Sequence, residues 1–540
     1  MITALYLVWA LVGLFLIVAW PRISTGRGWE LVALGGSLAL SVAHQAMFST
    51  VAEDAFISLR YSMNLAEGNG FVFNAGEKVE GYSNFLWVIL VAAPGFVADV
   101  DYILVARVLG VLCTLAAVVL AHLLVKRITG KGAFGVLAAT LTAAATSLAA
   151  YGPSGLESPL FVLLLFAVLL AVHADKFLVA GLLVALATLT RPDGAIVAAV
   201  VGVWVLVVTM RARSGVRPVL WYLVGALVIA VPWTAWRLTY YGHLLPNAVA
   251  AKSGADLGWQ LEVGWDYFLS FAGATQAALV LVPLAVYRLT SRRTEGEPGA
   301  RRAIWLMLLL ALVYLTFFIG TGGDWMPAWR FFAPVVPLLT AATVAAWGLA
   351  GAEATRPVGR AAAIGTVTIS LFALMVSTNH PSTKPAIEAW RLQVYDLSDI
   401  GTWLRDTLPD GTVISTYANG ALSYEAGPDV TVVDLLGLTD EHIAREGKRL
   451  PRGVIGHTAY DYEYVIEERE PAVVFFQGGG YLPAIDCSSR PPFDDEYTAI
   501  PFQVRGEQKY AMTYLRKETL EKYADLLDRH SDFTRMNCPG

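Results

Sequence analysis

The sequence predicts a mainly α-helical, polytopic membrane protein: a transmembrane helical bundle of about twelve helices, followed by a soluble C-terminal α/β domain. Of the 540 residues, 56% are hydrophobic and only 15% are charged, whereas about 25% of the residues in a soluble domain are charged. Apolar runs of span length recur from residue 2 to residue 378, and beyond about residue 380 they give way to charged and polar residues. We therefore expect a membrane domain over 1–379 and a small α/β domain over 380–540.

The length of each apolar run selects the candidate spans. A membrane-crossing helix needs roughly 17–25 mostly apolar residues, and fewer where it is short and surrounded by protein. This rule selects the ranges 2–20, 30–49, 102–125, 133–150, 159–174, 177–190, 194–210, 218–238, 274–289, 303–320, 332–350 and 361–378. The run from Phe85 to Val97 is short and contains Pro94, so we expect it to lie at the membrane interface.

Lysine and arginine gather in short loops on one side of this predicted bundle. The residues are Arg22, Arg27, Lys126, Arg127, Lys131, Arg211, Arg213, Arg217, Arg288, Arg292, Arg293, Arg301, Arg302, Arg356 and Arg360. Because cytoplasmic loops carry an excess of these residues, this side is predicted to face the cytoplasm across a plasma (inner) membrane. The loops 51–100, 151–158, 240–271 and 321–330 and the C-terminal domain then face outward. They hold most of the residues suited to chemistry, which predicts an extracytoplasmic active site.

The acid pair Glu53 and Asp54 opens the first outer loop. A short amphipathic helix is predicted after it, with Phe56 and Leu59 on one face, and it ends before Gly68. Ionisable groups at a membrane boundary are costly, and they indicate a functional site. We expect Asp54 to be the main catalytic carboxylate and Glu53 its partner, as a general base or as an electrostatic partner of a sugar cation. The alternative is that Asp54 only caps the helix.

Outer cations and polar or aromatic side chains supply candidate ligands. A lipid phosphate held at this depth needs Arg or Lys contacts, and these cations would also stabilise a phosphate leaving group. The candidates are Arg60, Arg191, Arg237, Lys252 and Arg330, with headgroup contact at span ends as the alternative. Aromatic rings beside polar groups suit sugar binding, with an interfacial aromatic belt as the alternative. These candidates are Tyr61, Glu80, Tyr82, Asn84, Glu157, His243, Asn247, Asp324, Trp325 and Trp329.

Other classes of site have little support in the sequence. There is no phosphate-binding GxxxxGK[ST] loop, no zinc ligand spacing, and a net charge of −5 gives no reason to expect nucleic acid. We therefore expect no cofactor and no metal. Asp99 and Asp101 mimic a metal–nucleotide triplet but lie between apolar runs. Cys487 and Cys538 in the tail would pair if the tail faces an oxidising compartment; otherwise they are two free thiols.

Six segments carry a resemblance to a known family. They are EDAFISLRYSMNLAEGNGFVFNAGEKVEGYSNFLW from Glu53, SGLESPLF (154–161), TRPDG (190–194), YYGHLLPNAVAAK (240–252), GGDWMPAWRFFAPVVP (322–337) and VVDLLGLTDEHIAR (432–445). Together they resemble the terminal arabinofuranosyltransferase family (AftB-like, also called ZomB-like), membrane glycosyltransferases of the GT-C class. The acid pair of that family falls on Glu53 and Asp54, with Glu-Asp here where Asp-Asp is common, so which acid is essential stays open.

The resemblance implies a GT-C fold and a reaction at the extracytoplasmic face. It implies transfer of arabinofuranose from a polyprenyl-phosphate donor, decaprenyl-phosphoryl-arabinofuranose, to the end of a cell-wall arabinan chain through a β-(1→2) bond. If donor and product are both β, configuration is retained, and both a carboxylate nucleophile and a front-face mechanism remain open. The alternatives are a transferase of another polyprenyl-phosphate sugar and a non-enzymatic membrane protein, such as a lipid flippase or a motility-associated scaffold.

Overall fold

The structure, a computed structural model, describes residues 2–213, 215–275, 279, 281–290, 298–349 and 357–539. Its residues form two units. Unit 1 contains Met1–Thr50, Arg107–Trp236 and Leu257–Ile387, and unit 2 contains Val51–Ala106, Arg237–Asp256 and Glu388–Gly540. Arg292, Arg293, Arg356 and part of the predicted span 274–289 lie outside the described residues.

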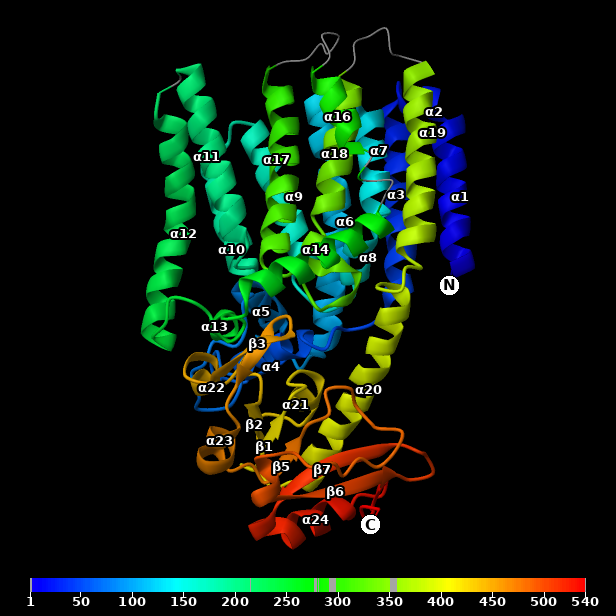
Figure 1. Ribbon diagram of the computed structural model, residues 1–540. Helices are drawn as coiled ribbons and strands as arrows, with labels where there is room; N and C mark the ends of the chain where they lie inside the picture. Colours follow the sequence, from blue (N-terminus) through cyan, green and yellow to red (C-terminus); the bar gives the residue numbers. More distant parts are fainter. Residues whose placement is uncertain are drawn as a thin grey trace. The chain divides into compact units, whose positions relative to one another are not determined.

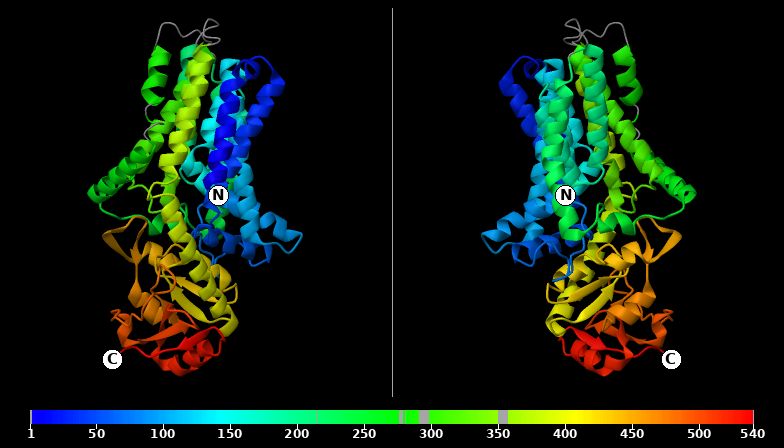
Figure 2. Two further views of the ribbon diagram at one scale, coloured as in Figure 1. Left: turned by 90° about the vertical axis from the view of Figure 1, so that its right-hand side faces the viewer. Right: turned by 90° about the vertical axis from the view of Figure 1, so that its left-hand side faces the viewer.

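Long helices dominate unit 1 (Figure 1; Figure 2), and most of them are apolar. Within the described residues, seven helical stretches are long and apolar enough to cross a membrane. They are Arg27–Phe48 (α3 with a short turn), Tyr102–Thr129 (α6), Gly194–Ala212 (α11), Arg217–Tyr241 (α12), Pro298–Gly320 (α17), Pro327–Gly348 (η3 and α18) and Gly359–Ser377 (from α19). Each corresponds to a span selected from the sequence, so the predicted membrane bundle is confirmed.

Unit 1 also contains four shorter apolar helices among its described residues. They are α1 (Ile2–Val18), α7 (Gly132–Ala143), α9 (Ser158–His173) and α10 (Phe177–Thr190). The predicted span 133–150 is two helices, because Ala145 is extended (φ −71°, ψ 106°) and separates α7 from α8 (Thr146–Tyr151). Two further helices are α14 (Leu257–Ala274) and α16 (Leu281–Thr290); α14 lies in a stretch that the sequence predicted to be an outer loop.

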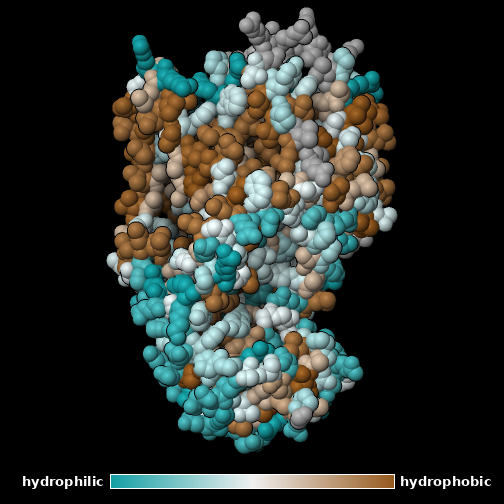
Figure 3. All heavy atoms as spheres, in the orientation of Figure 1, coloured by the Kyte–Doolittle hydropathy of each residue, from teal (hydrophilic) through white to brown (hydrophobic). Residues whose placement is uncertain are grey.

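The outward faces of the unit 1 helices are apolar. Figure 3 shows brown, hydrophobic side chains along these helices. On α12, Leu227 and Val231 are more than half exposed, and Leu14 and Val18 of α1 are exposed to a similar degree. A water-soluble protein rarely exposes so large an apolar surface, whereas a lipid-facing surface requires it.

A six-stranded sheet forms the centre of unit 2, in the order β2-β1-β5-β7-β6-β8. The strands are β1 (Val413–Thr416), β2 (Thr431–Asp434), β5 (Val473–Phe475), β6 (Tyr497–Val504), β7 (Tyr510–Arg516) and β8 (Phe533–Arg535). The first three are parallel, with Ile414 opposite Val432 and Val473, and the last three pair antiparallel. A separate hairpin joins β3 (Lys448–Val454) to β4 (His457–Tyr460).

Helices and a disulfide complete unit 2. The helix α20 (Lys384–Thr407) precedes β1, and the buried indole of Trp403 stacks on Phe533 with ring centroids 4.2 Å apart. Predicted helix 387–408 and strands 411–416, 430–434 and 472–476 agree with α20, β1, β2 and β5 to within three residues. Cys487 and Cys538 form a disulfide with a Cα–Cα distance of 6.0 Å.

The first outer loop also belongs to unit 2. It contributes α4 (Ala55–Ala66) and α5 (Phe85–Ala92), and the stretch 237–256 contributes α13 (Asn247–Ala251). From the sequence, both stretches are predicted to belong to the membrane domain 1–379. They group with the tail because buried polar side chains bond to backbone groups more than 180 residues further along the chain, for example Asn74 to Val432 and Asn247 to Gly437.

Candidate active site

Glu53 lies in the turn before α4 and is buried. Its Oε1 accepts a hydrogen bond of 2.7 Å from the backbone N–H of Gly420, just before α21 (Ala421–Glu425). Burial, and then the neighbouring charge of Asp54, raises the pKa of Glu53 to about 8. Glu53 is therefore mostly protonated at neutral pH, and it holds the chain at Gly420.

Asp54 occupies the N-cap position of α4, but its side chain makes no capping hydrogen bond. The interpretation that Asp54 only caps this helix is therefore wrong. Its side chain is half-buried, whereas that of Glu53 is buried. Of the two acids, Asp54 is the more exposed, which favours it as the reactive carboxylate.

A third acid, Asp434, belongs to the same group and was missed as a site residue. It ends β2, is fully buried, and accepts backbone N–H bonds from Leu436 (2.9 Å) and Thr439 (3.0 Å). Burial raises the pKa of Asp434 to about 6, and its charge in turn raises that of Glu53. Two features of the sequence could have identified Asp434: it ends a predicted strand, and it lies in the segment 432–445 that carries the family resemblance.

Glu80 and Arg237 form a buried ion pair in unit 2. The Nε of Arg237 donates to Oε2 of Glu80 at 2.6 Å. Burial raises the pKa of Glu80 to about 7, against the opposing effect of Arg237. Beside them lies a small polar cavity that Lys78, His243, Asn247 and Arg445 help to line, and His243 pairs with Glu441 at 2.6 Å. Arg237 is thus already paired with a carboxylate, and His243 is held at the surface.

Arg60 and Asn247 both donate hydrogen bonds to backbone carbonyl oxygens. The guanidinium of Arg60 is fully buried, and it donates to the carbonyl oxygens of Phe73 (2.8 Å), Val430 (2.8 Å) and Ser423. The side-chain amide of Asn247 donates to three carbonyl oxygens, those of Gly437, Leu438 and Asp440, over 2.9–3.2 Å. These side chains bond to backbone groups in the 420–440 region, so we assign them a role in holding unit 2 together rather than in contacting substrate.

Tyr61, Tyr82 and Asn84 are also buried side chains of unit 2. The Tyr61 hydroxyl donates to the carbonyl of Val79 at 2.7 Å, and the Tyr61 and Tyr82 rings meet edge to face at 4.8 Å. The Tyr82 hydroxyl lies 3.1 Å from that of Tyr241, and Oδ1 of Asn84 accepts from Ser58. These contacts shape the loop that presents the acid pair.

Lys252 differs from the predicted arginines. It caps the C-terminus of α13, is half-buried, and its aliphatic chain passes beside Gly456. Within the part of the chain that the structure describes, its ammonium has neither a hydrogen-bond nor an ion-pair partner. Among the five predicted phosphate ligands, Lys252 is therefore the one whose charge is not already matched by an acceptor in the described residues.

Unit 1 holds the remaining predicted residues in a second cluster. Arg191 donates to Glu157 (3.3 Å) and Asp193 (2.9 Å), and Asp193 accepts a bond from the Tyr314 hydroxyl at 3.0 Å. Arg330 pairs with both carboxylate oxygens of Asp324, at 2.8 and 3.2 Å. This bidentate geometry is the one by which arginine also binds phosphate, and here a carboxylate occupies it.

Aromatic side chains support this second cluster. The guanidinium carbons of Arg191 and Arg330 lie 5.0 and 4.7 Å from the centroid of the Phe331 ring. Trp329 is buried, donates to Ser270 at 3.3 Å, and has a left-handed backbone (φ 51°), while Trp325 is half-exposed. A bulky residue with positive φ is strained, and such strain is typical of functional loops.

The predicted residues thus fall into two groups. Unit 2 holds Glu53, Asp54, Arg60, Tyr61, Glu80, Tyr82, Asn84, Arg237, His243, Asn247 and Lys252, and unit 1 holds Glu157, Arg191, Asp324, Trp325, Trp329 and Arg330. In the described ranges, no group of three or more His, Cys, Asp or Glu residues is arranged to hold a metal ion.

Sequence comparisons identify two similar proteins and one family model. Residues 385–523 match a family described as a domain of unknown function (DUF8728). The chain is 30% identical over 335 residues to a terminal β-(1→2)-arabinofuranosyltransferase of Corynebacterium glutamicum. This match covers 54% of this chain and 48% of that protein. The chain is 29% identical over 329 residues to a protein of the same name from Mycobacterium tuberculosis, with coverages of 54% and 51%. The chain therefore matches about half the length of these relatives.

Solved structures share the fold. Those of ArnT from Cupriavidus metallidurans, bound to undecaprenyl phosphate and in the apo state, align with TM-scores of 0.54 and 0.56. In both cases the sequences are 12% identical, and the match covers 91% of this chain and 98% of ArnT. The comparisons confirm the resemblance to arabinofuranosyltransferases and the predicted GT-C fold. Together with the seven apolar helices, they indicate a multi-pass membrane protein.

Proposed function

We propose that this chain transfers arabinofuranose from decaprenyl-phosphoryl-arabinofuranose to the end of a cell-wall arabinan chain, through a β-(1→2) bond. The names of the two relatives support the sugar and the linkage, and the lipid in the ArnT complex supports a polyprenyl-phosphate donor. We place the reaction at the extracytoplasmic face of the plasma membrane, where the positive-inside rule puts the acid loop.

The acid pair at the start of α4 carries this proposal. Glu53 is buried, bonded to Gly420 and mostly protonated at neutral pH, which leaves Asp54 as the acid of the pair that contacts substrate. In the proposed transfer, a bond from the acceptor oxygen to the anomeric carbon replaces the bond from that carbon to the phosphate oxygen, either directly or through a covalent intermediate. Decaprenyl phosphate leaves with the electron pair, and the acceptor's proton passes to Asp54.

Lys252 is the proposed ligand of the donor phosphate. A phosphodiester departs as an anion, and a cation beside it stabilises the charge that develops in the transition state. Lys252 suits this role because its ammonium is not matched by an acceptor among the described residues. Arg191 and Arg330 are each bonded to carboxylates within unit 1.

Transfer by the purified full chain tests the proposal. With a synthetic polyprenyl-phospho-arabinofuranose and an oligo-arabinan acceptor in detergent, we expect Asp54→Asn to lower turnover by at least about 100-fold. The exposed Asp410→Asn is the matched control and should leave turnover unchanged. Undiminished turnover by Asp54→Asn would reject the assignment of this residue.

Further measurements separate the alternatives. Transfer from another polyprenyl-phosphate sugar, with none from the arabinose donor, would reject the sugar. Activity in detergent, where there is no second compartment, would exclude a pure flippase. If a β-linked donor yields a β product, configuration is retained, and an arabinosyl group trapped on Asp54 would distinguish a double displacement from a front-face reaction.

We also propose that the C-terminal domain contributes to acceptor binding. The half-buried rings of Tyr417 and Phe476 follow β1 and β5, with centroids 6.0 Å apart, and the Tyr417 hydroxyl bonds to that of Tyr462. Ligands of parallel sheets bind beyond the carboxyl ends of the strands, and aromatic faces suit sugar C–H groups. Tyr417→Ala should weaken transfer to long acceptors more than to short ones; equal effects would reject this role.

A further inference from the structure

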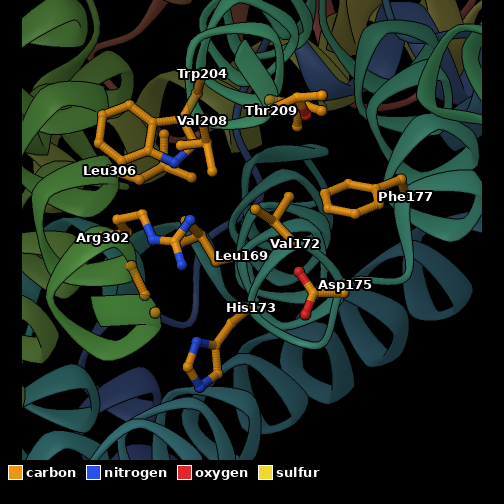
Figure 4. A pocket seen from close by; sticks show the side chains of 13 residues that line it. Leu169, Val172, His173, Asp175, Phe177, Trp204, Val208, Thr209, Arg302 and Leu306 are labelled. Atoms are coloured by element: carbon orange, nitrogen blue, oxygen red, sulfur yellow. The ribbon is translucent and has the colours of Figure 1, made fainter. Parts of the chain in front are cut away.

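A cavity in unit 1 is lined by residues that the proposed reaction does not use. It lies where α9 ends, α10 begins, α11 ends and α17 begins, and its volume is about 90 Å³ (Figure 4). A cavity of about 10–15 Å³ holds a single water molecule, so this cavity has room for several heavy atoms. Leu169, Val172, Phe177 and Trp204 form apolar walls.

Two opposite charges face this cavity. Arg302 from α17 lines one side and Asp175, between α9 and α10, lines another (Figure 4). The Nε of Arg302 donates to the carbonyl of Pro298 at 3.2 Å, and its terminal amino groups have no partner within the described ranges. The Asp175 carboxylate likewise has none there. The cavity therefore offers an unmatched cation and an unmatched anion to one ligand.

The backbone of Asp175 supports a role for its side chain. Its φ of 56° lies in the left-handed region, where glycine is favoured over residues that carry a Cβ. A glycine at this tight connection between α9 and α10 would avoid that cost, and Asp is among the few residues that tolerate it. The carboxylate is thus kept at a position where the backbone alone would favour glycine.

We propose that this cavity binds the headgroup of a bilayer aminophospholipid, phosphatidylethanolamine. The guanidinium of Arg302 would bind the phosphate and Asp175 the primary ammonium, while the acyl chains lie on the exposed apolar side chains of α11 and α17, such as Leu206 and Trp305. A phosphatidylcholine ammonium has no N–H to donate to Asp175. A phosphatidylglycerol headgroup carries no cation, so Asp175 would face an anion.

Lipid retention by the purified chain tests this site independently of glycosyl transfer. After delipidation, native mass spectrometry with phosphatidylethanolamine, phosphatidylcholine and phosphatidylglycerol in turn should show at least fivefold stronger retention of the first lipid. Asp175→Asn should abolish the preference for ethanolamine over choline, and Arg302→Gln should weaken retention of phosphatidylethanolamine and phosphatidylglycerol together.

Neighbouring charges outside the cavity provide the controls. Lys176→Gln and Arg211→Gln remove exposed cations that do not line it, and they should leave the preference unchanged. Melting temperatures of all four variants in detergent would confirm that they are folded. Equal retention of the ethanolamine and choline lipids, or a preference that survives Asp175→Asn in a folded variant, would overturn the proposal.

Discussion

The raised pKa of Glu53 predicts a specific pH dependence of stability. A carboxyl group whose pKa rises from the ordinary 4.5 to about 8 on folding holds its proton more tightly in the folded chain. The stability that this group contributes is complete below the unfolded pKa and is lost as the pH rises through the folded one. From about pH 6 to about pH 9, that loss amounts to about 2.5 kcal/mol.

Glu53→Gln isolates this contribution. The amide does not titrate, and its oxygen can still accept the N–H of Gly420, so the variant should be nearly as stable as the parent at pH 6. Between about pH 6 and about pH 9 the parent should lose about 2.5 kcal/mol more of its unfolding free energy than the variant. Taking the difference between the two proteins cancels the titration of all other groups that the substitution leaves unperturbed.

Denaturant unfolding in detergent, followed by circular dichroism, measures this difference. The exposed Glu496→Gln is the matched control and should follow the parent at every pH. If Glu53→Gln and the parent lose stability equally with rising pH, Glu53 is not protonated in the folded state. The assignment of Asp54 as the acid that contacts substrate would then lose its main support.

Three other predictions follow from single contacts. Lys252→Gln should raise the KM for the lipid donor about tenfold and weaken its salt dependence, because one charge-assisted bond is worth about 1.5–3 kcal/mol; an unchanged KM would exclude Lys252 from the phosphate site. Replacing Cys487 and Cys538 by serine opens a loop with a sequence separation of 51, and this should lower the free energy of unfolding by about 4 kcal/mol, whereas an unchanged denaturation midpoint would contradict it. Gly323→Ala places a Cβ 2.5 Å from the Tyr267 ring at a φ of 73°, so the melting temperature should fall by several degrees, and a wild-type value would contradict the described loop.

The structure also changes how the tail should be tested. Deleting residues 380–540 would remove the acceptors of buried donors in the first loop, such as the carbonyls that Arg60 and Asn74 contact. Leaving a buried guanidinium unpaired is strongly destabilising, so a truncated chain would lose the acid loop as well as the tail. Point substitutions such as Tyr417→Ala avoid this problem.

The sequence suggested candidate site residues by their type but not the partners that they bond to. Carboxylates and cations in the outer loops were found because charged residues are rare in an apolar chain. Their partners were not predictable, because Glu53 meets Gly420 and Arg60 meets Val430 across separations of 367 and 370 residues. Asp434 was missed because a carboxylate at a strand end looks ordinary until its burial is known.

The sequence by itself determined the membrane bundle, the α/β character of the tail and its main strands. Hydropathy over about twenty residues, and the alternation of helix and strand patterns, are local properties that a single chain displays directly. Only the tertiary structure decided which charges are already matched, that the first loop belongs with the tail, and that Glu53 bonds to the backbone N–H of Gly420. Burial and hydrogen bonding set pKa values and free charge, and both depend on neighbours that are brought together only by folding.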